Sequence, residues 1–188
     1  PFYNVRYYIF AGLLFMYVGT ESSINGWLTT YLSDVVVLKK VSPQDVLSIF
    51  WIATIVGRLL SAHLSNFFSK EILLLIYSLG GAVFFALFVL SSLELFVVLC
   101  VVMMGLFFAG VYPTTVANAS SLIKGSGTAA GIMLSLGGLG GAVVPYLNGL
   151  IAEHKGLYAS MSVIIFFGLI LIGIAITNIF MAKTEKTF

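Results

Sequence analysis

The chain has 188 residues, of which 60% are hydrophobic and only 9% are charged, and its formal net charge is +2. Because soluble domains carry about 25% charged residues, this composition excludes an ordinary water-soluble globule and indicates a protein of the lipid bilayer. The small net charge gives no basis for nucleic-acid binding, and a lone cysteine, Cys100, excludes a disulfide framework. Since the chain starts with Pro1 rather than Met, we expect a fragment, a processed product or an engineered piece.

Six long apolar segments follow one another along the chain. A helix needs roughly 20 apolar residues to cross a bilayer core of about 30 Å. The segments that reach this length are residues 7–32, 46–68, 72–91, 95–119, 128–152 and 157–182. Backbone amides and carbonyls in hydrocarbon need internal partners, and a helix supplies them all. We therefore predict an all-α membrane protein, with residues 1–188 forming a single six-helix transmembrane bundle.

The distribution of basic residues predicts the orientation of this bundle. With the N-terminus in the cytoplasm, the residues on or toward the inside are Arg6, Arg58, Lys70, Lys124, Lys183 and Lys186, and those outside are Lys39, Lys40 and Lys155. The positive-inside rule favours this orientation, and an even number of spans places both chain ends on one side. We predict a multi-pass protein of the cell membrane with both termini in the cytoplasm.

A weak internal repeat relates the first segment to the fourth. The stretch GLLFMYVGT at residues 12–20 resembles GLFFAGVYPT at residues 105–114. The repeat divides the chain into two three-helix units at about residues 5–91 and 95–182. Because an odd number of helices reverses the direction of the second unit, the two would be inverted repeats, which are typical of transporters.

The first segment carries a polar stripe in its apolar sequence. Tyr17, Glu21 and Asn25 recur every four residues and therefore share one helix face. An ionised carboxylate that faces lipid at this depth costs at least ~2.5 kcal/mol. We predict that the stripe lines a pathway for a solute or protons. The alternative is that Glu21 only bonds a neighbouring helix.

The second segment places Trp51 and Arg58 on one helix face. Arg58 could pair with Glu21, directly or through water. It could equally extend its long side chain toward the cytoplasmic interface. Both interpretations of Arg58 stay open. Trp51 and Arg58 are both candidates for the pathway.

The fourth and fifth segments contain helix-breaking residues. In the fourth, Pro113 removes one helix hydrogen bond, and Thr115 and Asn118 supply polar groups nearby. Such a break is tolerated where it lines a cavity or packs on protein. In the fifth, the residues of interest are Gly137, Gly141 and Pro145. They indicate either a hinge or a close-packing surface.

The third and sixth segments hold few polar groups, and we expect them to be lipid-facing supports. The sequence shows no metal-ligand cluster, no nucleophile paired with a base, no phosphate loop and no dinucleotide fingerprint. We therefore predict no catalytic residue, no metal and no cofactor.

Four stretches resemble a known family: YVGTESSINGWLTTYL, GRLLSAHLSNFFSK, GVYPTTVANASSLIKGSG and GIMLSLGGLGGAVVPYLNGLIAE. They resemble the C-terminal half, helices seven to twelve, of a major facilitator superfamily transporter. Within this superfamily they are most similar to the fucose/glucose–galactose proton symporter branch. The resemblance covers nearly the whole chain. It implies a second six-helix half around a central cavity. By match, the cavity-lining positions are Tyr17, Glu21, Asn25, Tyr112, Thr115 and Asn118.

Three functions are compatible with these features. The first is the C-terminal half of a secondary active transporter that moves a small organic solute by alternating access, with sugars and protons as candidate cargoes. Its partners would be the lipid bilayer, the solute, and an N-terminal half or a second copy, with no nucleic acid. The alternative is a non-transporting six-helix scaffold, receptor or self-assembling half. An intramembrane enzyme is the weakest reading, because the sequence offers no catalytic constellation.

Overall fold

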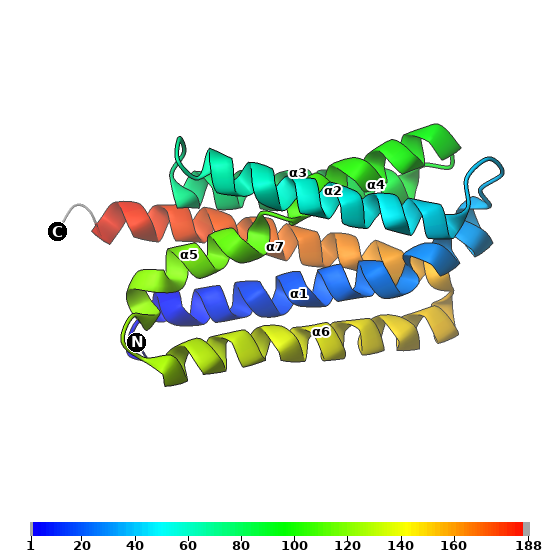
Figure 1. Ribbon diagram of the computed structural model, residues 1–188. Coiled ribbons are helices and arrows are strands. Elements are labelled where there is room, and N and C mark those ends of the chain that lie inside the picture. Colours follow the sequence, from blue (N-terminus) through cyan, green and yellow to red (C-terminus); the bar gives the residue numbers. More distant parts are fainter. Residues whose placement is uncertain (1, 186–188) are drawn as a thin grey trace.

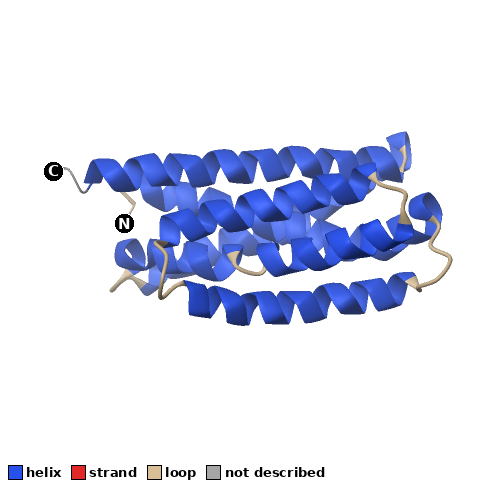
Figure 2. Cartoon of the chain, turned by 90° about the horizontal axis from the view of Figure 1, so that it is seen from above, coloured by secondary structure: helices blue, strands red, loops and turns tan. Residues whose placement is uncertain are grey.

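The structure is a computed structural model that describes residues 2–185, with side chains described for residues 2–182. Within this range it contains helices, turns and loops but no strand (Figures 1 and 2), which confirms the all-α prediction. The helices are α1 (Val5–Tyr31), α2 (Pro43–Leu64), α3 (Lys70–Leu90), α4 (Glu94–Phe108), α5 (Val111–Ile123), α6 (Gly127–Lys155) and α7 (Leu157–Glu185). A short π-helical turn, η1 (Leu32–Val36), follows α1.

Among the residues that the structure describes, five segments are long and apolar enough to cross a membrane: α2, α3, the consecutive pair α4–α5, α6, and residues 157–182 of α7. The first predicted span is a helix of 27 residues in the structure and has the required length. Its composition falls short because Thr20, Glu21, Ser23 and Asn25 interrupt its C-terminal half. The segment whose polarity suggests a functional site is therefore the one with the weakest membrane signal.

Serine side chains begin three of the helices. Ser42, Ser69 and Ser126 precede α2, α3 and α6, and each hydroxyl accepts a hydrogen bond from the backbone N–H three residues later. This contact satisfies one of the amides that a helix start leaves without an intrahelical partner. Pro43 at the first position of α2 needs no such partner. Gly156 adopts a φ of 85°, which allows the sharp turn from α6 into α7.

The predicted fourth span is two helices rather than one. The chain turns at Ala109 and Gly110, and α5 starts again with a hydrogen bond of 3.1 Å from the Thr114 N–H to the Gly110 carbonyl. Pro113 explains the break, because it has no N–H to offer the Ala109 carbonyl and its ring collides with that carbonyl in a regular helix. The predicted effect of Pro113 on the backbone therefore lies at residues 109–110, four positions earlier in the chain.

The helices pack into a bundle in which α1 lies beside α6 along its length (Figure 1). α1 also contacts α7, while α3 packs against both α4 and α7, and α2 packs against α4. Of the long apolar segments, α3 and the α4–α5 pair are the most buried, and α6 is the least buried. α3 therefore supplies core as well as a lipid-facing surface, because it lies between two other helices.

Glycines bring α1 and α6 close together. A Cβ atom added at Gly140 would overlap the Phe15 carbonyl oxygen and lie 2.7 Å from the Phe15 carbonyl carbon. Gly137 and Gly141 face α1 at longer range, with added Cβ atoms 3.4 Å from Leu14 Cβ and 3.1 Å from Val18 Cγ1 respectively. The tightest approach thus belongs to Gly140, which the GxxxG pattern does not contain. Removing the side chain at this point lets two backbones touch.

Pro145 lies inside α6, and the helix continues past it to Lys155. Its carbonyl partner four residues earlier is Gly141, on the face toward α1. Pro145 thus leaves its helix continuous, whereas the chain turns before Pro113.

We predict that Gly140→Ala destabilises the bundle, because the new methyl group collides with backbone rather than with a movable side chain. Overpacking of this kind costs about 1–3 kcal/mol. Gly138→Ala on the same helix is the matched control, since no described atom beyond its own helix lies within 4 Å of a Cβ at that position. Thermal unfolding in detergent should show a lower Tm for Gly140→Ala and an equal or higher Tm for Gly138→Ala. Equal shifts would contradict the proposed backbone contact.

Candidate functional site

An open cavity of about 580 Å³ lies among α1, α2, α3 and α5. Its lining combines apolar, hydroxyl and charged side chains from all four helices and the turn after α2. The lining residues are Val18, Glu21, Arg58, Ser61, Ala62, Ser65, Lys70, Leu73, Tyr112, Pro113, Thr114 and Ala117. A cavity with three ionisable side chains among membrane-spanning helices is suited to a polar ligand or to water.

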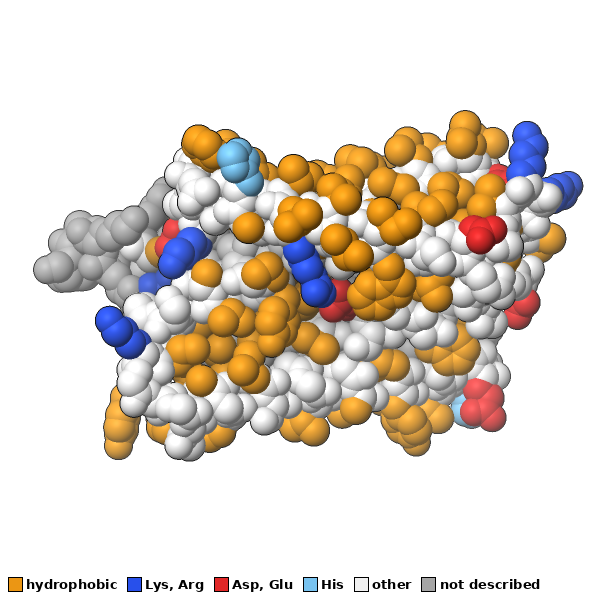
Figure 3. Space-filling model, viewed as in Figure 1, with side chains coloured by type: hydrophobic (Ala, Val, Ile, Leu, Met, Phe, Trp, Pro, Cys, Tyr) orange, Lys and Arg blue, Asp and Glu red, His pale blue; other side chains and the backbone are white. Residues whose placement is uncertain are grey.

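Glu21 and Arg58 form the charged centre of the cavity. The Arg58 guanidinium is close enough to act electrostatically on the Glu21 carboxylate. Among the side chains described, however, the two form no ion pair, and the Glu21 Oε1 atom is buried without a hydrogen-bond partner. Figure 3 shows a basic and an acidic side chain adjoining midway along the face formed by α2, α5 and α1. Because the two side chains form no ion pair, both charges are available to a third group.

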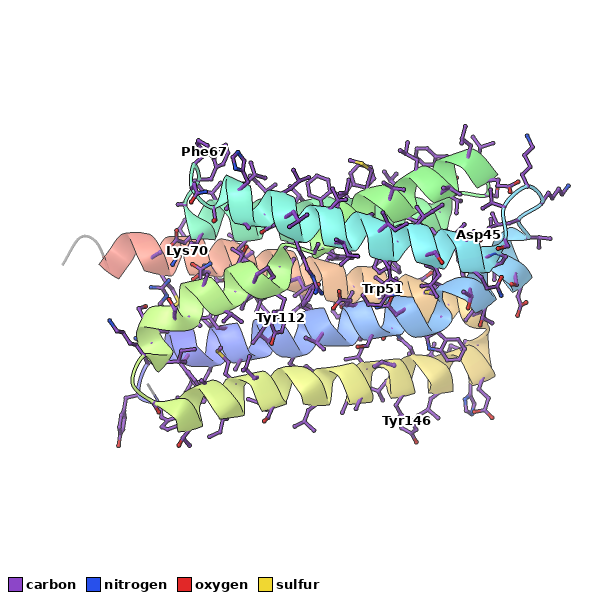
Figure 4. All side chains as sticks on the ribbon, in the orientation of Figure 1. Asp45, Trp51, Phe67, Lys70, Tyr112 and Tyr146 are labelled. Atoms are coloured by element: carbon purple, nitrogen blue, oxygen red, sulfur yellow. The ribbon has the colours of Figure 1, made fainter. Side chains whose placement is uncertain are left out.

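Lys70 closes one end of the cavity. Its Nζ atom donates a hydrogen bond of 3.1 Å to the Ala117 carbonyl oxygen, which joins the start of α3 to α5. Figure 4 shows Lys70 and Tyr112 beside α5, with Trp51 farther along the same face. The sequence predicts Lys70 only as an inner-side charge between the second and third segments, and the structure places it in the cavity wall.

Three of the predicted pathway residues line this cavity, namely Glu21, Arg58 and Tyr112. Pro113, predicted as a hinge or packing residue, lines it too. The break before Pro113 therefore adjoins the cavity. α5 enters the cavity wall as a short separate helix instead of continuing the line of α4.

Other predicted pathway residues lie elsewhere. Tyr17 is buried, with its ring edge against Phe108 at a centroid distance of 6.2 Å. Its hydroxyl faces the Glu21 carboxylate without a hydrogen bond of ordinary geometry. Thr115 Oγ1 donates to the Val111 carbonyl at 2.7 Å. Asn118 Nδ2 donates to the Thr114 carbonyl at 2.9 Å. These last two side chains therefore satisfy their polar groups on their own helix.

Asn25 and Trp51 lie outside the cavity lining as well. Asn25 is half-buried, and its Oδ1 atom is buried without a hydrogen-bond partner among the described residues. Trp51 is 44% exposed and packs edge-on against Phe50. Neither residue therefore belongs to the cavity wall.

The predicted set of pathway residues did not include several lining residues, among them Ser61, Ser65 and Thr114. Ser61 and Ser65 follow Arg58 at steps of three and four residues, so an extension of the Arg58 stripe along α2 would have found them. No comparable signal exists for Lys70 and Ala117. Their meeting depends on how α3 and α5 pack, which no local pattern encodes.

We predict that cysteines in the cavity wall react with a water-soluble thiol reagent. Ala117→Cys should be labelled, because Ala117 lines the cavity, whereas Ala119→Cys on the same helix should stay unlabelled, because Ala119 is fully buried. The native Cys100 is buried and should give little background. Labelling can be followed by mass shift in membrane vesicles. Equal labelling of both variants would contradict this assignment of the cavity wall.

Comparison with known proteins matches the chain to one protein family and to several relatives. The family model described as Major Facilitator Superfamily matches residues 9–187. The chain is 30% identical over 156 residues to Major facilitator superfamily domain-containing protein 4B of Danio rerio, covering 81% of this chain and 29% of that protein. It is 30% identical over 171 residues to Bypass of stop codon protein 6 of Saccharomyces cerevisiae, covering 82% and 33% respectively.

A further relative is described as a sugar transporter. The chain is 28% identical over 180 residues to a Glucose/galactose transporter of Brucella abortus, covering 84% of this chain and 40% of that protein. The chain thus spans between 29% and 40% of the length of these three relatives.

Proposed function

The chain belongs to the Major Facilitator Superfamily and is a multi-pass membrane protein, and from this membership we propose that it forms the C-terminal half of a secondary active transporter. In this proposal the protein moves a small organic solute by alternating access and does no enzyme chemistry. Its partners are the bilayer, the solute, and a further six-helix half, either an N-terminal one or a second copy.

The observation that carries the proposal is the cavity around Glu21 and Arg58. Two opposite charges midway along apolar helices are costly unless water, a partner or a ligand compensates them. Here four helices surround an open cavity that contains both charges, and Glu21 Oε1 has no hydrogen-bond partner among the described residues. A solute with hydroxyl groups can accept hydrogen bonds from Arg58 and donate them to Glu21.

The packing of the helices supports the proposed division into repeats at about residues 5–91 and 95–182. In chain order, α1 corresponds to the α4–α5 pair, α2 to α6, and α3 to α7. The α1–α6 contact then corresponds to the α2–α4 contact, and the α1–α7 contact corresponds to the α3–α4 contact. The α3–α7 contact maps onto itself. The close glycine contacts correspond in the same way. Gly57 on α2 abuts the Leu106 backbone on α4, and Gly140 on α6 abuts the Phe15 backbone on α1. We propose that the units are inverted repeats between which the solute site forms.

Sugars are the solutes we propose first, because a Glucose/galactose transporter is among the relatives at 28% identity. Protons are the proposed coupling ion, with Glu21 as the group that carries them. We further propose that the protein resides in the cell membrane with both termini in the cytoplasm. The start of α1 and the end of α7 lie at the same end of the bundle (Figure 1), which supports a common side for the termini.

We predict that Glu21→Gln lowers solute uptake and flattens its dependence on pH, because the amide cannot exchange a proton. The measurement is uptake of labelled glucose and galactose by the intact carrier in liposomes under an imposed pH gradient. Glu153→Gln is the control, since Glu153 is exposed and lies outside the cavity lining. Unchanged uptake and pH dependence would remove Glu21 from the mechanism. Failure of the unmodified protein to take up any of a panel of solutes would favour the non-transporting scaffold.

A second prediction concerns the charge pair. Neutralising either Glu21 or Arg58 alone leaves the other charge without compensation, whereas neutralising both removes the conflict. The double variant Glu21→Gln, Arg58→Gln should therefore be less destabilised than the sum of the two single variants, by about 1 kcal/mol. Thermal or denaturant unfolding of the four proteins gives this coupling. Strict additivity would show that the two charges do not sense each other.

A further inference from the structure

A second hollow, a groove, lies at the junction of α6 and α7. This groove has a volume of about 670 Å³ and is lined by Leu150, Ile151, His154, Lys155, Tyr158, Ala159, Ser162 and Val163. It shares no lining residue with the central cavity. We propose that it binds an anionic phospholipid, with the phosphate headgroup near Lys155 and an acyl chain along the apolar wall.

The apolar wall of the groove fits a hydrocarbon chain. Leu150 and Ile151 on α6 face Ala159 and Val163 on α7 across the hollow. Leu150 is 38% exposed, so the wall is open to its surroundings rather than filled by the protein. The proposal places lipid in these surroundings. An acyl chain laid along this wall would add van der Waals contacts that the two helices do not make with each other.

The charged end of the groove fits a phosphate. Lys155 lies in the last turn of α6, and its ammonium is a compact cation with three donors. His154 Nδ1 lies 2.8 Å from the Leu150 carbonyl, and since a carbonyl only accepts, Nδ1 carries the proton in this contact. The Nε2 atom is then directed away from that carbonyl. No carboxylate belongs to the lining, although the neighbouring Glu153 is exposed.

The order of these groups favours a phospholipid over a free polar solute. The groove is cationic at the helix ends and apolar farther along both helices, which is the order of headgroup and acyl chain in a bilayer. Tyr158 is 50% exposed at the same end, and tyrosine side chains are enriched at the level of the headgroups. Under the proposed orientation Lys155 lies at the outer face, where a basic side chain can attract the headgroup of an anionic lipid in that leaflet. A free anion would gain nothing from the apolar wall.

The test uses native mass spectrometry of the intact protein with added phosphatidylglycerol or phosphatidylcholine. We expect phosphatidylglycerol to stay bound, and Lys155→Gln to weaken it about fivefold, which corresponds to about 1 kcal/mol per basic residue. Lys39→Gln is the matched control, because Lys39 is exposed in the loop at the same end of the bundle but outside the groove (Figure 1). Ala159→Trp should lower binding of both lipids by filling the groove.

Several outcomes would overturn the proposal. Equal losses from Lys155→Gln and Lys39→Gln would show general surface attraction, and equal retention of the two lipids would show no preference for charge. Full competition by inorganic phosphate would show that the apolar wall contributes nothing. Unfolding temperatures of all variants are compared first, and Lys155→Arg should retain binding if charge at this position is what matters.

Discussion

The position of the Glu21 carboxylate in the middle of an otherwise apolar helix is the constraint around which the bundle is organised. A charge at this depth needs water, a hydrogen-bond donor or an opposite charge. The Arg58 guanidinium on α2 acts electrostatically on this carboxylate, but Glu21 Oε1 has no hydrogen-bond partner among the described residues. The walls of the cavity then follow, because α1, α2, α3 and α5 surround these charges without filling the space between them.

Close helix packing and a broken helix together create that space. Gly57 and Gly140 let α2 and α6 lie against the backbones of α4 and α1, so the bundle is tight where it carries no ligand. On the cavity side, Pro113 ends the line of α4 and starts α5 as a separate helix. The same chain thus holds one region of dense backbone contact and one region kept open.

The helices could be predicted from the sequence because length and hydrophobicity are local properties. The same local reasoning found Glu21 and Arg58, since a charge inside an apolar run is visible without a structure. It assigned Thr115 and Asn118 to the pathway, whereas both side chains bond the carbonyl four residues earlier in their own helix. A helix wheel cannot foresee that choice, because the side chain can turn either way. The Lys70 contact with Ala117 was out of reach, since it depends on the packing of two helices far apart in sequence.

The bundle starts and finishes at one end (Figure 1). Any soluble partner fused to the first residue of α1 would therefore share a compartment with one fused after α7. A fluorescent donor and acceptor attached at these two positions would stay on one side of the bilayer throughout a conformational cycle. Their energy transfer would then report on movement within the bundle, without interference from the membrane between them.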